Sequence, residues 1–145
     1  MNVKAILAAK KQGGDTIGIE PTANLAAAAK LLVANHIGAL VIRGAGGRLS
    51  GILSERDIVR ALSEQGVAAL DSPVAQFMTR DVETCGEDDS VASIMERMTA
   101  GKFRHMPVLR NGKLAGLVSI GDVVKQRVDE VERESEAMRD YIRTA

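Results

Sequence analysis

The chain has 145 residues, of which 46% are apolar and 26% charged, a composition typical of a folded globular protein rather than a disordered one. Lysine plus arginine and aspartate plus glutamate number 19 each, so the net charge is zero and nucleic acid is not expected as the main partner. One cysteine allows no internal disulfide, and no apolar run reaches the ~20 residues that cross a bilayer. Without a signal-peptide pattern in the first 12 residues, these features predict a soluble cytoplasmic protein away from membranes.

The first half of the chain predicts a β-α-β-β-α unit. An extended segment at 16–19 precedes a helix that begins near Asn24, a residue type that suits the N-cap. Two apolar strands at 37–42 and 49–53 flank a glycine-containing turn and form a hairpin, and a second helix begins at Ser54. The first helix has its apolar residues at the spacing of one buried stripe: Leu25, Ala28, Ala29 and Leu32.

The second half repeats this order. Residues 15–43 align with 81–109 without a gap, and 47–60 align with 112–125. The elements of the second copy are an extended segment at 82–85, a helix from Ser90, strands at 103–109 and 114–118, and a helix from Ser119. A unit of roughly 50–60 residues buries a poor core alone, so two units are expected to pack together about a pseudo-two-fold axis.

The duplication divides the chain into a first unit with its lead-in at 1–70, a second unit at 71–127 and a C-terminal helix at 128–145. On the final helix, mostly apolar residues recur at alternating spacings of four and three and form a seam along one side. They are Val124, Val128, Val131, Ser135, Met138 and Ile142. This seam covers fewer than three heptads, which is short for a free coiled coil. We expect it to pack on the protein's own core or on a second subunit.

Both units close with the pattern Gly-apolar-apolar-Ser-x-x-Asp, at 51–57 and 116–122. Together with the tandem β-α-β-β-α units and the strand at 103–108, this pattern resembles the cystathionine-β-synthase (CBS) domain pair, or Bateman module. The resemblance extends from Val3 to Arg127. It implies an α+β fold of two units with small three-stranded sheets, and a homodimer formed through helices.

The resemblance further implies a regulatory module that binds an adenosine-containing ligand in two clefts between the units. AMP, ADP or ATP is the first expectation, NAD or S-adenosylmethionine is possible, no metal is required, and the downstream target is not encoded. Ser54 and Asp57 are assigned to one cleft, and Ser119 and Asp122 to the other. A carboxylate accepts hydrogen bonds from both ribose hydroxyls, and a helix N-terminus favours phosphate.

The same Ser-x-x-Asp pattern is close to a capping box, which needs no ligand. The alternative is therefore a structural dimerisation module with empty clefts, in which these residues serve only as helix caps. The two roles are compatible, since a carboxylate has about four lone-pair sites.

The two units differ where a phosphate is expected. Arg104 and His105 correspond to Gly38 and Ala39 of the first copy. Arg104 offers a bidentate fork and His105 a titratable donor, unless they are a solvated strand-end charge and a structural histidine. Gly38 leaves room for a base or sugar, or else permits a tight strand crossing. Arg56 is a candidate phosphate clamp, or a surface charge paired with an adjacent acid.

The remaining candidates rest on the resemblance alone. It assigns the segments entering the first strands to the opposing cleft, and it uses apolar residues as walls for adenine, although these residues also suit loops and core. The residues concerned are Asp15, Thr16, Thr79 and Asp81 in the entering segments, and Ile37 and Phe103 as walls.

No enzyme signature is found. His36 and His105 form no metal box with a single cysteine, and the glycines at 44–47 lack the lysine of a P-loop. A triad of Ser119, His105 and Asp122 can be assembled, but the first copy repeats the serine and aspartate with no histidine beside them. We therefore expect no catalysis, and we expect Cys85 to be buried packing.

Overall fold

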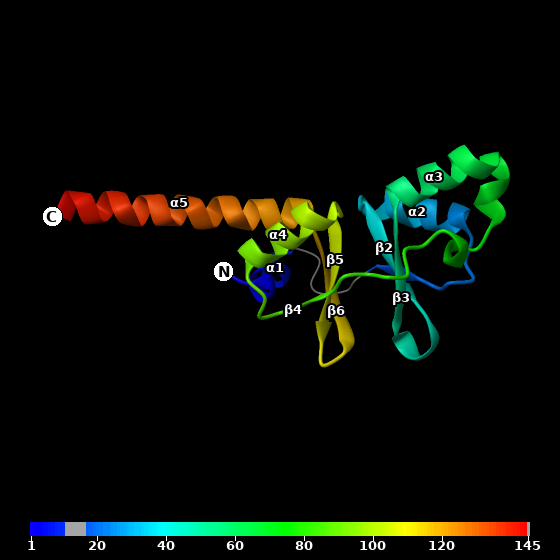
Figure 1. The fold of residues 1–145 in the computed structure, drawn as a ribbon, viewed down its shortest axis with the longest axis horizontal. Helices are drawn as coiled ribbons and strands as arrows, with labels where there is room; N and C mark the ends of the chain where they lie inside the picture. Colours follow the sequence, from blue (N-terminus) through cyan, green and yellow to red (C-terminus); the bar gives the residue numbers. More distant parts are fainter. Residues whose placement is uncertain (11–16, 145) are drawn as a thin grey trace.

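The computed structural model describes residues 1–10 and 17–144, and in it the two halves of the chain form two similar α+β units side by side (Figure 1). The sheet of the first unit has the order β1 (Gly18–Ile19), β2 (Ala39–Arg43), β3 (Leu49–Ser54), and that of the second has the order β4 (Cys85–Gly86), β5 (His105–Arg110), β6 (Lys113–Ser119). In each sheet the short first strand runs parallel to the middle strand, which forms an antiparallel hairpin with the last. The predicted fold class is confirmed.

The helices begin at the predicted caps. The helices of the described residues are α1 (Val3–Ala9), α2 (Leu25–Asn35), α3 (Glu55–Gln65), α4 (Val91–Gly101) and α5 (Ile120–Thr144), with 3-10 turns at Ala45–Gly47, Gly66–Asp71 and Val74–Gln76. Asn24 accepts a hydrogen bond from the Ala27 N–H at 2.9 Å, and Ser90 accepts one from the Ser93 N–H at 3.1 Å. These bonds satisfy N–H groups that have no partner within the helix.

The middle strands begin two residues later than the sequence predicts, at Ala39 and His105. The preceding helices end at His36 and Lys102, both in the left-handed conformation with φ of 53° and 57°. The two residues after each cap complete the reversal of the chain before pairing can start. Gly38 and Arg104 therefore lie at the entrances to the two sheets.

Each unit has its own apolar core, and each core includes the lead-in segment of the other half of the sequence. Val3 and Ile6 of α1 are buried in the core of the second unit, with Ile94 and Met106. Val74, in the lead-in segment of the second unit, is buried in the core of the first. The exchange ties the two units together, because each lead-in crosses from one unit to the other.

The segment that leads into the second unit, residues 74–79, also pairs with the first sheet; it is called the second lead-in below. Ile52 of β3 and Thr79 exchange backbone hydrogen bonds of 3.0 and 2.9 Å. A Cβ atom on Gly51 would lie 2.6 Å from the Thr79 carbonyl oxygen, closer than real contacts allow. A glycine is therefore required where the crossing segment meets β3.

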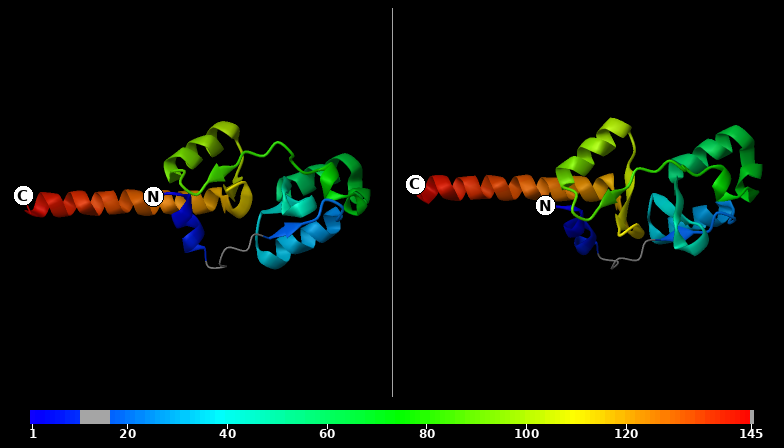
Figure 2. Two further views of the ribbon diagram at one scale, coloured as in Figure 1. Left: turned by 90° about the horizontal axis from the view of Figure 1, so that it is seen from below. Right: turned by 60° about the horizontal axis from the view of Figure 1, so that its bottom comes forward.

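The final helix leaves the second unit and extends away from the first (Figures 1 and 2). Val123 and Gln126 are its buried residues, whereas residues 131–144 are exposed. The expectation that the seam packs on the protein's own core is therefore wrong for the described residues. The helix continues past the end of the compact unit, so no part of that unit is available to cover it.

Cys85 is buried, as expected, and burial raises the pKa of its thiol to about 11. The thiol is therefore protonated and unreactive at neutral pH. None of the helices in the described part of the chain is long and apolar enough to span a bilayer.

Candidate functional site

A cleft of about 670 Å³ lies between the two units. The C-terminal end of β3 and the first turns of α3 form one wall of the cleft. Residues 79–83 and the segment between α4 and β5 form the other. Most of the site residues predicted from the sequence line it: Gly38, Ala39, Ser54, Arg56, Asp57, Thr79, Asp81, Phe103, Arg104 and His105. Residues far apart in the chain meet here because the second lead-in crosses β3.

Asp57 is held at the N-terminus of α3 by a capping box. Its Oδ2 accepts hydrogen bonds from the Ser54 backbone N–H at 2.8 Å and from the Ser54 hydroxyl at 3.1 Å, while Ser54 Oγ caps the Asp57 N–H at 3.3 Å. The side chain is only 6% exposed. The capping interpretation of the motif is thus realised, and Asp57 has a fixed orientation.

The second oxygen of Asp57 faces a cation that the sequence did not single out. Arg60 donates to Asp57 Oδ1 at 3.1 Å, and its side chain is 58% exposed. A carboxylate has about four lone-pair sites, so Oδ1 retains one acceptor site even with this bond in place. Because Arg60 is exposed, it can also turn aside and leave Oδ1 to a ligand. The sequence did offer a signal for this ion pair, because Arg60 follows Asp57 by about one helical turn.

Three further cations surround the cleft. Arg56, Lys102 and Arg104 are exposed, and no carboxylate in residues 1–10 or 17–144 lies within ion-pair distance of any of them. The alternative in which Arg56 pairs with a neighbouring acid is therefore absent from the described residues. Lys102 was not predicted, because its role depends on the left-handed turn that places it at the rim. The three cations together offer donors for an anionic group.

The space beside Gly38 is occupied by side chains. A Cβ atom there would lie 2.9 Å from Glu55 Oε1 and 3.4 Å from His105 Nε2. The atoms nearest to Gly38 therefore belong to two side chains rather than to a crossing strand, and Gly38 itself lines the cleft. Burial lowers the pKa of His105, against the opposing effect of Glu55, so the imidazole is neutral at pH 7. A neutral histidine supplies one donor and one acceptor, but no charge for a phosphate.

The second Ser-x-x-Asp pair, Ser119 and Asp122, lies outside this cleft. Asp122 accepts from the Ser119 N–H at 2.9 Å, and Ser119 Oγ accepts from the Asp122 N–H at 3.2 Å. Lys10 lies 3.0 Å from Asp122 Oδ2 and donates to the Leu117 carbonyl. Asp15 and Thr16, assigned to the same predicted site, lie outside the described residues.

Ile37 also lies elsewhere. It lines a shallow apolar groove between α2 and α3, together with Leu32, Val33 and Val59. Of the two predicted apolar walls, Phe103 alone lines the cleft between the units. Ile37 is partly buried and packs against the core of the first unit, which is the alternative that the sequence left open for it.

The CBS domain family model matches residues 15–64 and 74–129, which include both halves of the duplication. The chain belongs to the CBS domain family. It is a tandem CBS pair, and the two matched segments each contain one Ser-x-x-Asp motif.

Solved CBS structures share most of this architecture. A CBS-domain containing protein from Agrobacterium tumefaciens is 44% identical, with a TM-score of 0.82 over 87% of this chain and 92% of that one. A CBS domain protein from Pyrobaculum aerophilum in complex with AMP is 27% identical, with a TM-score of 0.73 over 84% of this chain and 89% of that one.

The CBS domain pair of protein MJ0100, solved with 5′-methylthioadenosine and S-adenosyl-L-methionine, is 27% identical, with a TM-score of 0.78 over 90% of this chain and 98% of that one. Among curated relatives, a 17.7 kDa protein of Acidianus ambivalens is 39% identical over 112 residues, and the match spans 66% of its length. The match to a mitochondrial CBS domain-containing protein of Arabidopsis thaliana spans 58% of that protein's length.

The ion pair of the second CBS motif predicts a pH dependence of stability. Burial acts to raise the pKa of Asp122, but the Ser119 hydrogen bond and Lys10 outweigh it and hold the pKa below the ordinary 3.8. A depressed pKa stabilises the fold above the unfolded-state value, and the contribution is lost as the pH falls through the folded value. We expect Asp122→Asn to flatten the decline of the urea midpoint as the pH falls below about 4. Asp140→Asn, on the exposed end of α5, is the control, and equal slopes for wild type and Asp122→Asn would contradict the assignment.

Proposed function

We propose that the chain is a regulatory, non-catalytic module that binds an adenine nucleotide in the cleft between its two CBS domains. The observation that carries the proposal is the combination in one cleft of the oriented Asp57 carboxylate with three cations lacking an acidic partner among the described residues. A nucleotide presents two hydroxyl donors at one end and an anionic phosphate at the other, and this arrangement complements both ends.

The ligands of related structures support an adenosine-containing compound. One CBS neighbour was solved with AMP, and another with 5′-methylthioadenosine and S-adenosyl-L-methionine. We favour AMP, ADP or ATP because Arg56, Lys102 and Arg104 at the cleft suit a phosphate. NAD and S-adenosylmethionine are the second choice. Across the described residues no cluster of three His, Cys, Asp or Glu side chains forms a metal site, and the proposal uses no metal.

Binding in this cleft would act on the relative position of the two units. Asp57 belongs to the first unit, whereas Lys102 and Arg104 belong to the second, so a ligand that contacts both favours the arrangement that brings the contacts together. The shift is limited by the difference in affinity between the arrangements. We further propose a cytoplasmic homodimer as the regulatory form, acting on a partner protein whose identity the cleft does not reveal.

The proposal predicts stabilisation by nucleotide. AMP at 100 times its dissociation constant stabilises the native state by about 2.7 kcal/mol, which raises the melting temperature of a protein of this size by several degrees. Differential scanning fluorimetry with AMP, ATP, NAD, S-adenosylmethionine and adenosine at millimolar concentration tests it. Adenosine is expected to stabilise less than AMP, because it lacks the phosphate that the cations bind. If none of the five compounds shifts the transition, the dimerisation module with empty clefts is the better description.

A further inference from the structure

The exposed seam of α5 lies where no described part of its own chain covers it. Its apolar side chains are between 43% and 67% exposed: Val124, Val128, Val131, Met138 and Ile142. They step by four and three along the helix, and Ser135 occupies the remaining seam position. In a heptad written abcdefg, this places Val128, Ser135 and Ile142 at a, and Val124, Val131 and Met138 at d.

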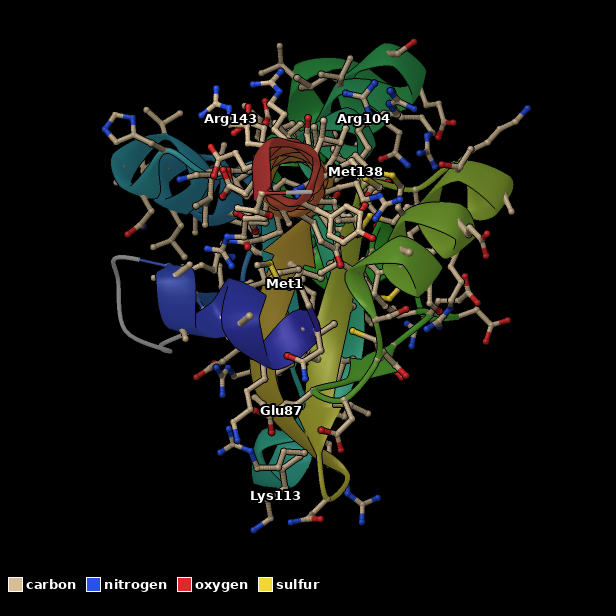
Figure 3. The ribbon with its side chains drawn as sticks, turned by 90° about the vertical axis from the view of Figure 1, so that its left-hand side faces the viewer. Met1, Glu87, Arg104, Lys113, Met138 and Arg143 are labelled. Carbon is tan, nitrogen blue, oxygen red and sulfur yellow. The ribbon has the colours of Figure 1, made fainter. Side chains whose placement is uncertain are left out.

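The compact unit packs on another side of α5. Val123 and Gln126 are buried, and Glu130 pairs with the Met1 ammonium group at 3.3 Å. These residues fall at heptad positions c and f, outside the a/d seam. Figure 3, which looks along α5 from its C-terminal end, shows Met1 and Met138 on different sides of the helix. A second helix can therefore reach the seam without displacing α1.

The charges that flank the seam select a partner and a direction. Position g holds Arg127 and Glu134, and position e holds Glu132 and Arg139. In a parallel two-stranded coiled coil each g residue faces the e residue five positions later on the partner helix. Arg127 then meets Glu132 of the second copy, and Glu134 meets its Arg139, so that both pairs are attractive.

An antiparallel pairing of the same seam has the opposite electrostatics. It brings e against e and g against g, so that Glu132 faces Glu132, Glu134 faces Glu134, and Lys125 faces Arg139. Like charges at these positions are unfavourable. Arg127 already pairs with Glu130 of its own helix at 3.0 Å, but a guanidinium has five donors and can bind both carboxylates.

We propose that the partner of α5 is a second copy of this chain, joined through the α5 seam as a parallel, in-register two-stranded coiled coil. The Glu134–Arg139 pairs, one on each side of the seam, fix the register and the direction of the pairing. The seam covers fewer than three heptads, which is short for a coiled coil that stands alone. The inference therefore rests on the homodimer proposed above, and it is independent of nucleotide binding. It places the two CBS pairs at the same end of the coiled coil.

Charge reversal tests the interface. Size-exclusion chromatography with light scattering at tens of micromolar is expected to show a dimer for the wild type. Glu134→Arg, which faces Arg139 of the partner, is expected to raise the dimer dissociation constant at least ~10-fold, and the double variant Glu134→Arg/Arg139→Glu to restore it. Glu136→Arg, at the outward b position, is the matched control and is expected to leave the dimer unchanged. A monomeric wild type, or a dimer indifferent to Glu134→Arg, would overturn the inference.

Cross-linking tests the direction. In the parallel arrangement Ile142→Cys lies opposite its own copy, so mild oxidation should give a disulfide-linked dimer; Asp140→Cys, at the outward f position, should not. The native Cys85 is buried and does not interfere. Failure of Ile142→Cys to cross-link, or equal cross-linking of both variants, would exclude the parallel pairing. Thermal shift with AMP on the same samples shows separately whether the nucleotide site is intact.

Discussion

Substitution of Asp57 by asparagine is expected to abolish most of the stabilisation that AMP confers. The carboxylate is held by the Ser54 capping box with Oδ1 directed to Arg60, and an amide supplies one acceptor oxygen in place of two. Hydrogen bonds to a charged group contribute roughly 1.5–3 kcal/mol each, so loss of the ribose contacts should weaken binding by about 10–100-fold. The quantity to measure is the AMP-induced change in melting temperature of each variant.

The substitution also weakens the capping box, so the melting temperature without ligand should fall. Asn24→Ala is the matched control, because it removes the cap of α2 in the same unit at a cost of about 1 kcal/mol but lies outside the cleft. It should retain the full response to AMP. With 2′-deoxy-AMP, the wild type should lose affinity and Asp57→Asn should lose little more, since the hydroxyl and the carboxylate belong to one contact. An unchanged response of Asp57→Asn to AMP would remove Asp57 from the site.

Gly51→Ala is expected to destabilise the protein by about 1–3 kcal/mol, because the added methyl group overpacks a backbone crossing. Its Cβ would lie 2.6 Å from the Thr79 carbonyl oxygen and 2.9 Å from Met78 Sδ. The backbone cannot rotate away as a flexible side chain can, so β3 and the crossing segment must separate. Chemical denaturation measures the loss as a lower free energy of unfolding.

The same movement should weaken nucleotide binding, because Thr79 and Asp81 reach the cleft only through that crossing. Gly86→Ala is the matched control: it is also a strand glycine, but no atom lies within 4 Å of its added Cβ. It should change stability little. Equal losses for Gly51→Ala and Gly86→Ala would show that the crossing is not as rigid as the backbone contacts require.

Local signals predicted much of the helix and strand arrangement. Asn24, Ser54, Ser90 and Ser119 start helices as expected, because capping depends on residues within one turn. The extent of the first strands was less accurate: β1 pairs with β2 only at Gly18–Ile19, and β4 begins at Cys85, where the predicted segment ends. Pairing partners of that kind are remote in sequence.

Within the candidate site, the sequence found the acids and missed part of the cationic rim. Asp57 carries a recognisable motif, whereas Arg60 and Lys102 matter only because α3 and the turn after α4 face the same space. For Gly38 the sequence left open either room for a ligand or a tight strand crossing, whereas Glu55 and His105 approach it from two different units. Such crowding depends on contacts between side chains that no local pattern records.

The duplication, the helix caps and the family were determined by the sequence alone, because periodicity and short motifs depend on neighbouring residues. Only the tertiary structure decided that the two Ser-x-x-Asp motifs differ in their surroundings. Asp57 faces Arg60 and the cleft, whereas Asp122 is bound by Lys10 from the first lead-in. The difference arises because each lead-in packs on the opposite unit, and that exchange is specified by burial in two separate cores rather than by any one segment.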